Sequence, residues 1–255
     1  MALNKAMNAL HSIRGAKGWG YNRETATDAD STAWAFRFLA KMGGHFGMDA
    51  AATLKHYLSS SGAARTFLDI KRFGSWALEH ADVTPVVGMA LIAVEADTAI
   101  VNRVRQACLD IWKANGLWPS FWWTIDSYST ARNLEFLSAS GGIPSNIGNS
   151  TWESLISLKE PGSPFEAANN LMAAISLGKI QTDFSVRQVM ILLEWQLHDS
   201  SWPSSPVLLV PEQKERTIGD YTPYGDCMHL MSTSMAAHAL NCYLLGDLKQ
   251  QTLVL

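Results

Sequence analysis

The sequence repeats itself, and the repeat limits the folds that the chain can adopt. Residues 28–39 read DADSTAWAFRFL, and residues 126–137, which lie 98 positions later, read DSYSTARNLEFL, so six of the twelve positions agree without a gap. A weaker copy, STSMAAHAL, begins at Ser232, which is 201 positions after Ser31. These distances are close to two and four times a unit of about 50 residues, a size typical of helical-pair repeats.

Each repeat is predicted to combine an outer helix with the inner helix that follows it. Looser copies at Thr84 and Ser163 complete a series of five, and all five segments are rich in small residues, as buried helices should be. The segments upstream of them are amphipathic. In 98–114, for example, Val101, Val104 and Cys108 belong to one apolar stripe. Outer helices are therefore predicted at 2–13, 48–60, 98–114, 148–158 and 184–198.

A tryptophan turn is predicted between the outer and the inner helix in four of the five pairs. It occurs as Gly18-Trp19, Gly74-Ser75-Trp76, Gly116-Leu117-Trp118 and Ser200-Ser201-Trp202. We find no strand alternation, and 203–226 is the longest predicted loop. The sequence thus predicts an all-α fold, an α/α toroid or barrel of about five to six helical hairpins in an inner and an outer layer. Residues 1–255 are expected to form one domain, and whether the toroid closes alone or by forming a homodimer is left open.

Composition and charge exclude several classes of protein. The net charge is -3 and the pI is near 6.1, so no basic excess points to nucleic acid. Three unevenly spaced cysteines without a CxxC pair argue against a disulfide framework and favour a cytoplasmic location. The N-terminus has no signal-peptide core, and no apolar run approaches the roughly 20 residues of a membrane span, although peripheral membrane contact is compatible with the sequence.

Two carboxylates at the start of the first inner helix are the leading candidates for chemistry. Asp28 and Asp30 precede Ser31 and Thr32, residue types that commonly cap helix N-termini. Asp28 aligns with Asp126 in the repeat, whereas Asp30 aligns with a tyrosine, so Asp30 is an addition to the repeated pattern. The two interpretations are an acidic catalytic pair and a simple N-cap cluster.

Aromatic and polar side chains on or beside the inner helices are candidates for binding a substrate. The chain has ten tryptophans. Aromatic rings can line a cavity or pack a core, while buried polar groups need partners, either in a substrate or in a neighbouring helix. Arg132 could pair with a carboxylate or phosphate, and His238 is interpreted mainly as a core histidine. The predicted substrate-binding residues are Trp34, Phe38, Phe121, Trp122, Trp123, Tyr128, Arg132, Asn133, Asn169 and His238, with Asn170 beside them.

Two motifs resemble those of a known family. Residues 196–202, QLHDSSW, resemble the Gln–Trp repeat of squalene and oxidosqualene cyclases, with Ser200 at a position that is usually glycine. Residues 28–33, DADSTA, resemble the Asp-X-Asp-Asp-Thr-Ala motif of class II terpene cyclases, with Ser31 in place of the third aspartate. The short chain is similar to the small single-domain members that cyclise prenylated aromatic compounds, the meroterpenoid cyclases.

This resemblance implies an isomerase that starts cyclisation with a proton. Asp30 would be the general acid that protonates an alkene of a linear isoprenoid or prenylated aromatic substrate, and Asp28 would support it. Burial would keep Asp30 protonated, against the opposing effect of the helix N-terminus, and aromatic faces would stabilise the carbocation. No cofactor or metal ligand is expected, and Mg²⁺ would be needed only for a diphosphate substrate.

Two other functions remain open, and a third is disfavoured. A protein prenyltransferase would need zinc, but Asp226, Cys227 and His229 are spaced too closely for that ligand pattern. A glycoside-processing toroid could use Asp30 with Glu166. A non-catalytic toroid that binds an isoprenoid or another lipid would not need Asp30 to be shielded from water.

Overall fold

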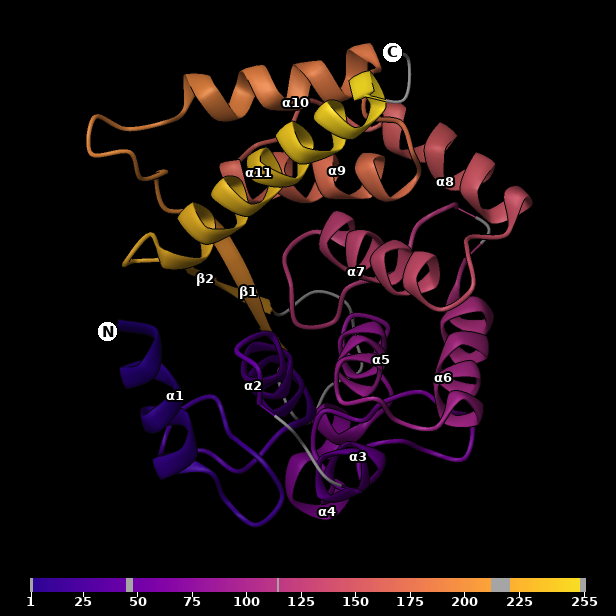
Figure 1. Cartoon of the computed structure of the whole chain (residues 1–255), viewed down its shortest axis with the longest axis vertical. Coiled ribbons are helices and arrows are strands. Elements are labelled where there is room, and N and C mark those ends of the chain that lie inside the picture. The colour runs from indigo at the N-terminus through magenta and orange to yellow at the C-terminus, as the bar shows by residue number, and fades with distance from the viewer. Residues whose placement is uncertain (1, 45–47, 114, 212–220, 253–255) are drawn as a thin grey trace. The chain divides into compact units, whose positions relative to one another are not determined.

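The protein is described by a computed structural model that covers residues 2–44, 48–113, 115–211 and 221–252. Most of these residues are helical, which confirms the all-α prediction (Figure 1). The chain divides into two compact units. The N-terminal unit lies within residues 1–111, and the C-terminal unit comprises 112–211 and 218–255. Among the described residues, no helix is both long and apolar enough to cross a membrane.

The N-terminal unit is built from two inner helices and the helices that accompany them. Inner helices α2 and α5 pack against each other, and α5 packs against α6. Ala29 N donates to Thr66 O and Ala64 N donates to Thr84 Oγ1, both over 2.9 Å. Both inner helices therefore begin beside the same short segment and run in the same direction. The elements are α1 (Ala2–Ile13), α2 (Ala29–Lys41), α3 (Met48–Lys55), α4 (Ile70–Phe73), the 3₁₀ helix η1 (Gly74–Ala77), α5 (Thr84–Ala93) and α6 (Thr98–Ile111).

The C-terminal unit repeats this arrangement around a central inner helix, α9. Helix α9 packs against α7, α10 and α11, and its side chains are buried along most of its length. The elements are α7 (Asp126–Ala139), α8 (Ser145–Ile156), α9 (Pro164–Ser176), α10 (Asp183–Glu194), β1 (Pro206–Pro211), β2 (Tyr221–Gly225) and α11 (Leu230–Thr252). All five predicted outer helices and all five predicted inner helices are found, with ends that differ by a few residues.

The prediction of a plain loop over 203–226 was wrong. Strands β1 and β2 pair antiparallel there, with Leu208 opposite Tyr224. On its other side β1 bonds to the segment before α7, since Leu209 N donates to Trp122 O and Thr124 N donates to Val207 O. The signal was missed because Val207 begins a continuous apolar run between two prolines, without the polar alternation by which a half-buried strand is recognised.

The repeated threonine and tryptophan explain why the sequence repeats. The backbone N–H groups of Trp19, Trp118 and Trp202 donate to the hydroxyls of Thr32, Thr130 and Thr233, over 2.9, 3.1 and 3.0 Å respectively. We call each of these bonds a Thr–Trp clasp. The indoles of Trp19 and Trp202 donate in turn to Leu10 O and Leu192 O, both over 2.7 Å. All three turns are thereby tied to the inner helix that follows, and the turns of Trp19 and Trp202 are also tied to the outer helix that precedes them.

Two details of the turns differ from the simple repeat. In the second pair Ala64 takes the place of the tryptophan, while Trp76 lies in η1 within a longer connection. In the last pair Ser200 has φ of 68°, a left-handed conformation that favours glycine. The serine therefore occupies the glycine position of the Gln–Trp motif in a conformation that suits glycine. Gln196 Nε2 donates to Ser200 O over 3.3 Å.

Candidate active site

Asp28 caps the N-terminus of α2. It has extended backbone angles, and its side chain accepts a hydrogen bond from Ser31 N over 2.7 Å. The residue is buried, and that burial raises the pKa of its carboxyl to about 6, although hydrogen bonds from Ser31 hold the rise back. The N-cap interpretation is thus correct for Asp28, and the cap is an unusually weak acid.

Asp30 lies in the first turn of α2 and carries the more perturbed carboxyl. Its Oδ1 atom is fully buried and accepts no hydrogen bond from the described residues. Burial raises the pKa of Asp30 to about 8, and the nearby carboxyls of Asp28 and Asp82 add to the rise. The indole N–H of Trp34 and the guanidinium of Arg37 oppose it. At neutral pH the Asp30 carboxyl is therefore mostly protonated, in spite of its position at a helix N-terminus.

Sequence reasoning missed two buried groups, His80 and Asp82. Both lie just before α5, which packs against α2 and begins at the same end of the unit. Burial lowers the pKa of His80 to about 4, so its imidazole is neutral at pH 7, whereas Asp82 adds negative potential at Asp30. A usable signal was present, because a histidine and an aspartate stand directly before an inner helix, as Asp28 does.

Trp34 and Phe38 follow Asp30 at intervals of one turn along α2. Trp34 is exposed, with 36% of its surface accessible, and Phe38 is half-buried. The guanidinium of Arg37 lies 4.4 Å from the centre of the Trp34 ring. Helix α2 therefore presents one face on which the Asp30 carboxyl, an indole and a phenyl ring follow one another.

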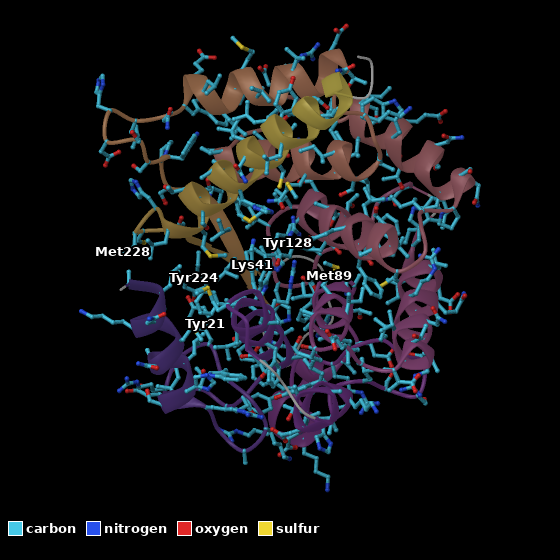
Figure 2. All side chains as sticks on the ribbon, viewed as in Figure 1. Tyr21, Lys41, Met89, Tyr128, Tyr224 and Met228 are labelled. Carbon is cyan, nitrogen blue, oxygen red and sulfur yellow. The ribbon has the colours of Figure 1, made fainter. Side chains whose placement is uncertain are left out.

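Two of the four predicted aromatic residues of the C-terminal unit, Trp123 and Tyr128, form a stack with Phe165. The ring of Trp123 lies 3.9 Å from that of Tyr128, and Phe165 stacks on both rings at 5.5 and 5.9 Å (Figure 2, where Tyr128 is labelled). These three rings are buried with Val207, whereas Trp122 is half-buried at the edge of the cluster. Phe121, also half-buried, meets Trp122 edge to face at 5.2 Å.

The predicted polar residues divide into a buried group and one exposed residue. Arg132, Asn133, Asn169 and Asn170 are each no more than 2% exposed. His238 is exposed on α11, where its ring lies 3.7 Å from Cys242 Sγ, so its interpretation as a core histidine was wrong. Asp28, Asp30, Trp34 and Phe38 belong to the N-terminal unit, and the other eight predicted site residues belong to the C-terminal unit.

Comparison with known proteins gives a fold match. No protein-family model and no curated protein sequence matches the chain. Among solved structures, the type II terpene cyclase MstE from Scytonema superimposes with a TM-score of 0.81 at 22% identity, over 96% of this chain and 82% of MstE. The chain has the type II terpene cyclase fold.

Further solved structures support this type II terpene cyclase fold. Variants of MstE were solved with geranylgeranyl dihydroxybenzoate, named as substrate, and with merosterolic acid A, named as product. The ent-copalyl diphosphate synthase from Streptomyces platensis matches with a TM-score of 0.67 at 15% identity, over 93% of this chain and 45% of that protein. The predicted fold is confirmed on this evidence.

Proposed function

We propose that this chain is a class II terpene or meroterpenoid cyclase, which converts a linear isoprenoid or prenylated aromatic substrate into a cyclic product. The observation that carries the proposal is the Asp30 carboxyl, which has a buried, unbonded oxygen and a pKa of about 8. Such a carboxyl is protonated at neutral pH. The chain that carries it has the type II terpene cyclase fold.

The first step transfers the Asp30 proton to an alkene carbon. The O–H bond breaks, a C–H bond forms, and the more substituted alkene carbon becomes a cation. The Trp34 N–H and the Arg37 charge, which oppose the rise of the Asp30 pKa, stabilise the carboxylate that remains. Further alkenes attack the cation to close rings, and loss of a proton ends the reaction, so substrate and product are isomers.

Asp28 helps to keep the Asp30 carboxyl protonated. Its carboxyl, with a pKa of about 6, ionises before that of Asp30, with a pKa of about 8. The resulting negative charge disfavours a second ionisation nearby. Asp82 acts in the same direction. Asp28 is therefore a positioning and charge-setting residue, and Asp30 alone contacts the reacting alkene.

The aromatic residues are assigned to shaping the substrate and stabilising its cations. An aromatic face can stabilise a desolvated cation by about 2 kcal/mol. Trp34 and Phe38 lie nearest to Asp30 along α2. The same role is proposed for Phe121, Trp122, Trp123 and Tyr128, and Asn133, Asn169 and His238 are proposed as polar contacts. The prenylated aromatic substrate bound by MstE supports this substrate class. Mg²⁺ would be required only if the substrate were a diphosphate.

We also propose that the enzyme is cytoplasmic, forms a single domain and makes only peripheral contact with membranes. We further propose that it forms a homodimer through α10. Helix α10 exposes Val186, Met190 and Leu193 on one face, each between 45 and 59% accessible, and Leu197 continues this face beyond the helix end. Two copies packed antiparallel on this face bring Met190 against the partner's Leu193. The same packing places Arg187 opposite the partner's Glu194. Two copies of this face can therefore pair apolar residues with apolar residues and opposite charges with each other.

The decisive experiment compares wild type with Asp30→Asn on prenylated benzoates, prenyl diphosphates and squalene. Mass spectrometry should show that wild type makes a product of unchanged mass and shifted retention, and that Asp30→Asn loses at least about a thousandfold in rate while still binding the substrate. Asp126→Asn is the matched control, since Asp126 is an exposed carboxylate at the start of the corresponding inner helix.

If both wild type and Asp30→Asn bind a prenyl ligand equally and neither converts it, the lipid-binding function replaces the cyclase. Hydrolysis of a glycoside dependent on Glu166 would establish the glycosidase instead.

A further inference from the structure

Helices α7 and α9 of the C-terminal unit are held side by side in a defined register. Both begin at the β1 segment, since Thr124 N donates to Val207 O over 3.2 Å and Phe165 N donates to Ser205 Oγ over 3.4 Å. The helices therefore run in the same direction. The stacked rings of Tyr128 and Phe165, 5.9 Å apart, show which residues of the two helices lie at the same level.

This register brings four buried polar side chains to one level. One turn beyond the rings, Arg132 follows Tyr128 by four residues and Asn169 follows Phe165 by four, and the next residues are Asn133 and Asn170. Side chains four residues apart on a helix lie above one another on the same face. Arg132 and Asn169 thus lie one turn above the aromatic stack, and Asn133 and Asn170 are the next residues along the two helices. We call these four buried residues the polar layer.

The protein satisfies only part of the hydrogen-bonding capacity of the polar layer. The amides of Asn133 and Asn169 donate to Ser129 O and Phe165 O, both over 2.8 Å. Arg132 Nη1 donates to Glu135 Oε2 over 2.6 Å. Within the described residues, Arg132 Nε and Nη2, Asn169 Oδ1 and both side-chain atoms of Asn170 have no partner. Buried polar atoms without partners are costly, so their presence points to a ligand that supplies the missing bonds.

The polar atoms that lack a hydrogen-bond partner indicate the chemistry of that ligand. Nε and Nη2 lie on one edge of the guanidinium and donate in parallel, which matches the two oxygens of a carboxylate. The Glu135 bond and the Tyr128 ring, 5.8 Å away, fix the orientation of this edge. Asn170 adds a third donor, and Asn169 Oδ1 can accept from a hydroxyl. Because Glu135 already neutralises much of the Arg132 charge, a monoanion is better matched to this layer than a diphosphate is.

We propose that Arg132, Asn169 and Asn170 bind the carboxylate of an aromatic acid, which forms the polar end of the substrate. This inference rests on the proposed cyclase function and narrows its substrate class to prenylated aromatic carboxylic acids. The aromatic stack of Trp123, Tyr128 and Phe165 lies at the adjacent level of the same helices.

Binding is tested without turnover, in the Asp30→Asn background, by calorimetry with a prenylated hydroxybenzoate, the same phenol lacking the carboxylate, and a prenyl diphosphate. Adding Arg132→Gln should weaken benzoate binding by at least about thirtyfold and leave phenol binding within about threefold. Lys159→Gln, which removes an exposed cation from the same unit, should change neither. Equal losses for benzoate and phenol, or no loss for either, would overturn the carboxylate site, as would tighter Arg132-dependent binding of the diphosphate.

A second variant separates a binding role from a structural one. Asn170→Leu replaces unbonded polar atoms by an apolar group of similar size, so we expect a higher melting temperature of the free protein together with weaker benzoate binding. A residue that braces the two helices would instead lower the melting temperature, and that result would contradict the proposal. If benzoate binds through Arg132 but wild type converts nothing, the carboxylate site stands and the cyclase function fails.

Discussion

Asp28 and Asp30 are separated by one residue, yet their carboxyls have different surroundings. Asp28 accepts the capping hydrogen bond of α2 and has a pKa of about 6, while Asp30 has an unbonded oxygen and a pKa of about 8. Between these values Asp28 is mostly ionised and Asp30 mostly protonated, which is the state that acid catalysis requires.

The charge of Asp28 can be removed without removing its cap. In Asp28→Asn the amide oxygen can still accept from Ser31 N, but the negative charge near Asp30 is lost. For wild type we expect the cyclisation rate to be constant below about pH 7 and to fall about tenfold per pH unit above about pH 8. In Asp28→Asn this fall should begin at a lower pH. A pH–rate profile measures the shift, and an unchanged profile would show that Asp28 does not set the acidity of Asp30.

Asp30 should also make the stability of the protein depend on pH. Its pKa is raised in the folded state, so the folded protein binds more protons than the unfolded chain between about pH 4 and pH 8. The free energy of unfolding contributed by this group is fully present below about pH 4 and is lost as the pH rises through about 8. Asp30→Asn removes the dependence, so its stability relative to wild type should increase by roughly 3 kcal/mol from pH 5 to pH 8. Urea unfolding of wild type and Asp30→Asn at both pH values tests this, and an equal stability difference at the two pH values would contradict it.

At the scale of helices and turns, most of the architecture could be predicted from the sequence. Small-residue inner helices and amphipathic outer helices have different periodic signals, and both kinds were found close to their predicted positions. The elements that were missed depend on distant contacts. Strand β1 is fixed by β2 and by residues 122–124, and His80 and Asp82 matter because α5 packs against α2. Such partners lie far apart in the chain, so the local sequence does not show which residues they contact.

The candidate site was predicted less completely than the fold. Asp30 stood out because it departs from the repeat, and the structure gives it the raised pKa expected of a buried acid. The exposure of His238 could not be foreseen, because α11 has little difference in hydrophobicity between its faces. The incomplete hydrogen bonding of Arg132 depends on its rotamer and on Glu135, which sequence spacing alone does not determine.

The turn before the last inner helix contains a residue that can be improved. Ser200 adopts φ of 68°, which costs a residue with a Cβ roughly 1 kcal/mol and costs glycine nothing. Ser200→Gly should therefore increase the free energy of unfolding by about 0.5–1 kcal/mol. Ser204→Gly, at an exposed position nearby, should decrease it because glycine gains entropy in the unfolded chain. Urea midpoints of the two variants should move in opposite directions, and a loss of stability in Ser200→Gly would contradict the account of this turn.

For the molecule as a whole, the exposed face of α10 predicts the oligomeric state. Met190→Glu places a charge at the centre of that face and should convert a dimer into a monomer, measured by light scattering during size-exclusion chromatography. Leu3→Glu, which introduces the same charge at an exposed apolar position on α1, should leave the dimer intact. A wild-type protein that is already monomeric at micromolar concentration would refute the proposed interface.

The Thr–Trp clasps have a consequence for how such a protein can change over time. Each clasp joins a threonine hydroxyl to a backbone N–H group, so the turn is secured without help from the side chain two positions before the threonine. That position holds Asp30 in the first copy, Tyr128 in the third and Met231 in the fifth. A duplicated helix pair therefore keeps its clasp, and the position two residues before the threonine is free to vary. A substitution at this position can therefore change the chemistry of a pair without breaking its clasp.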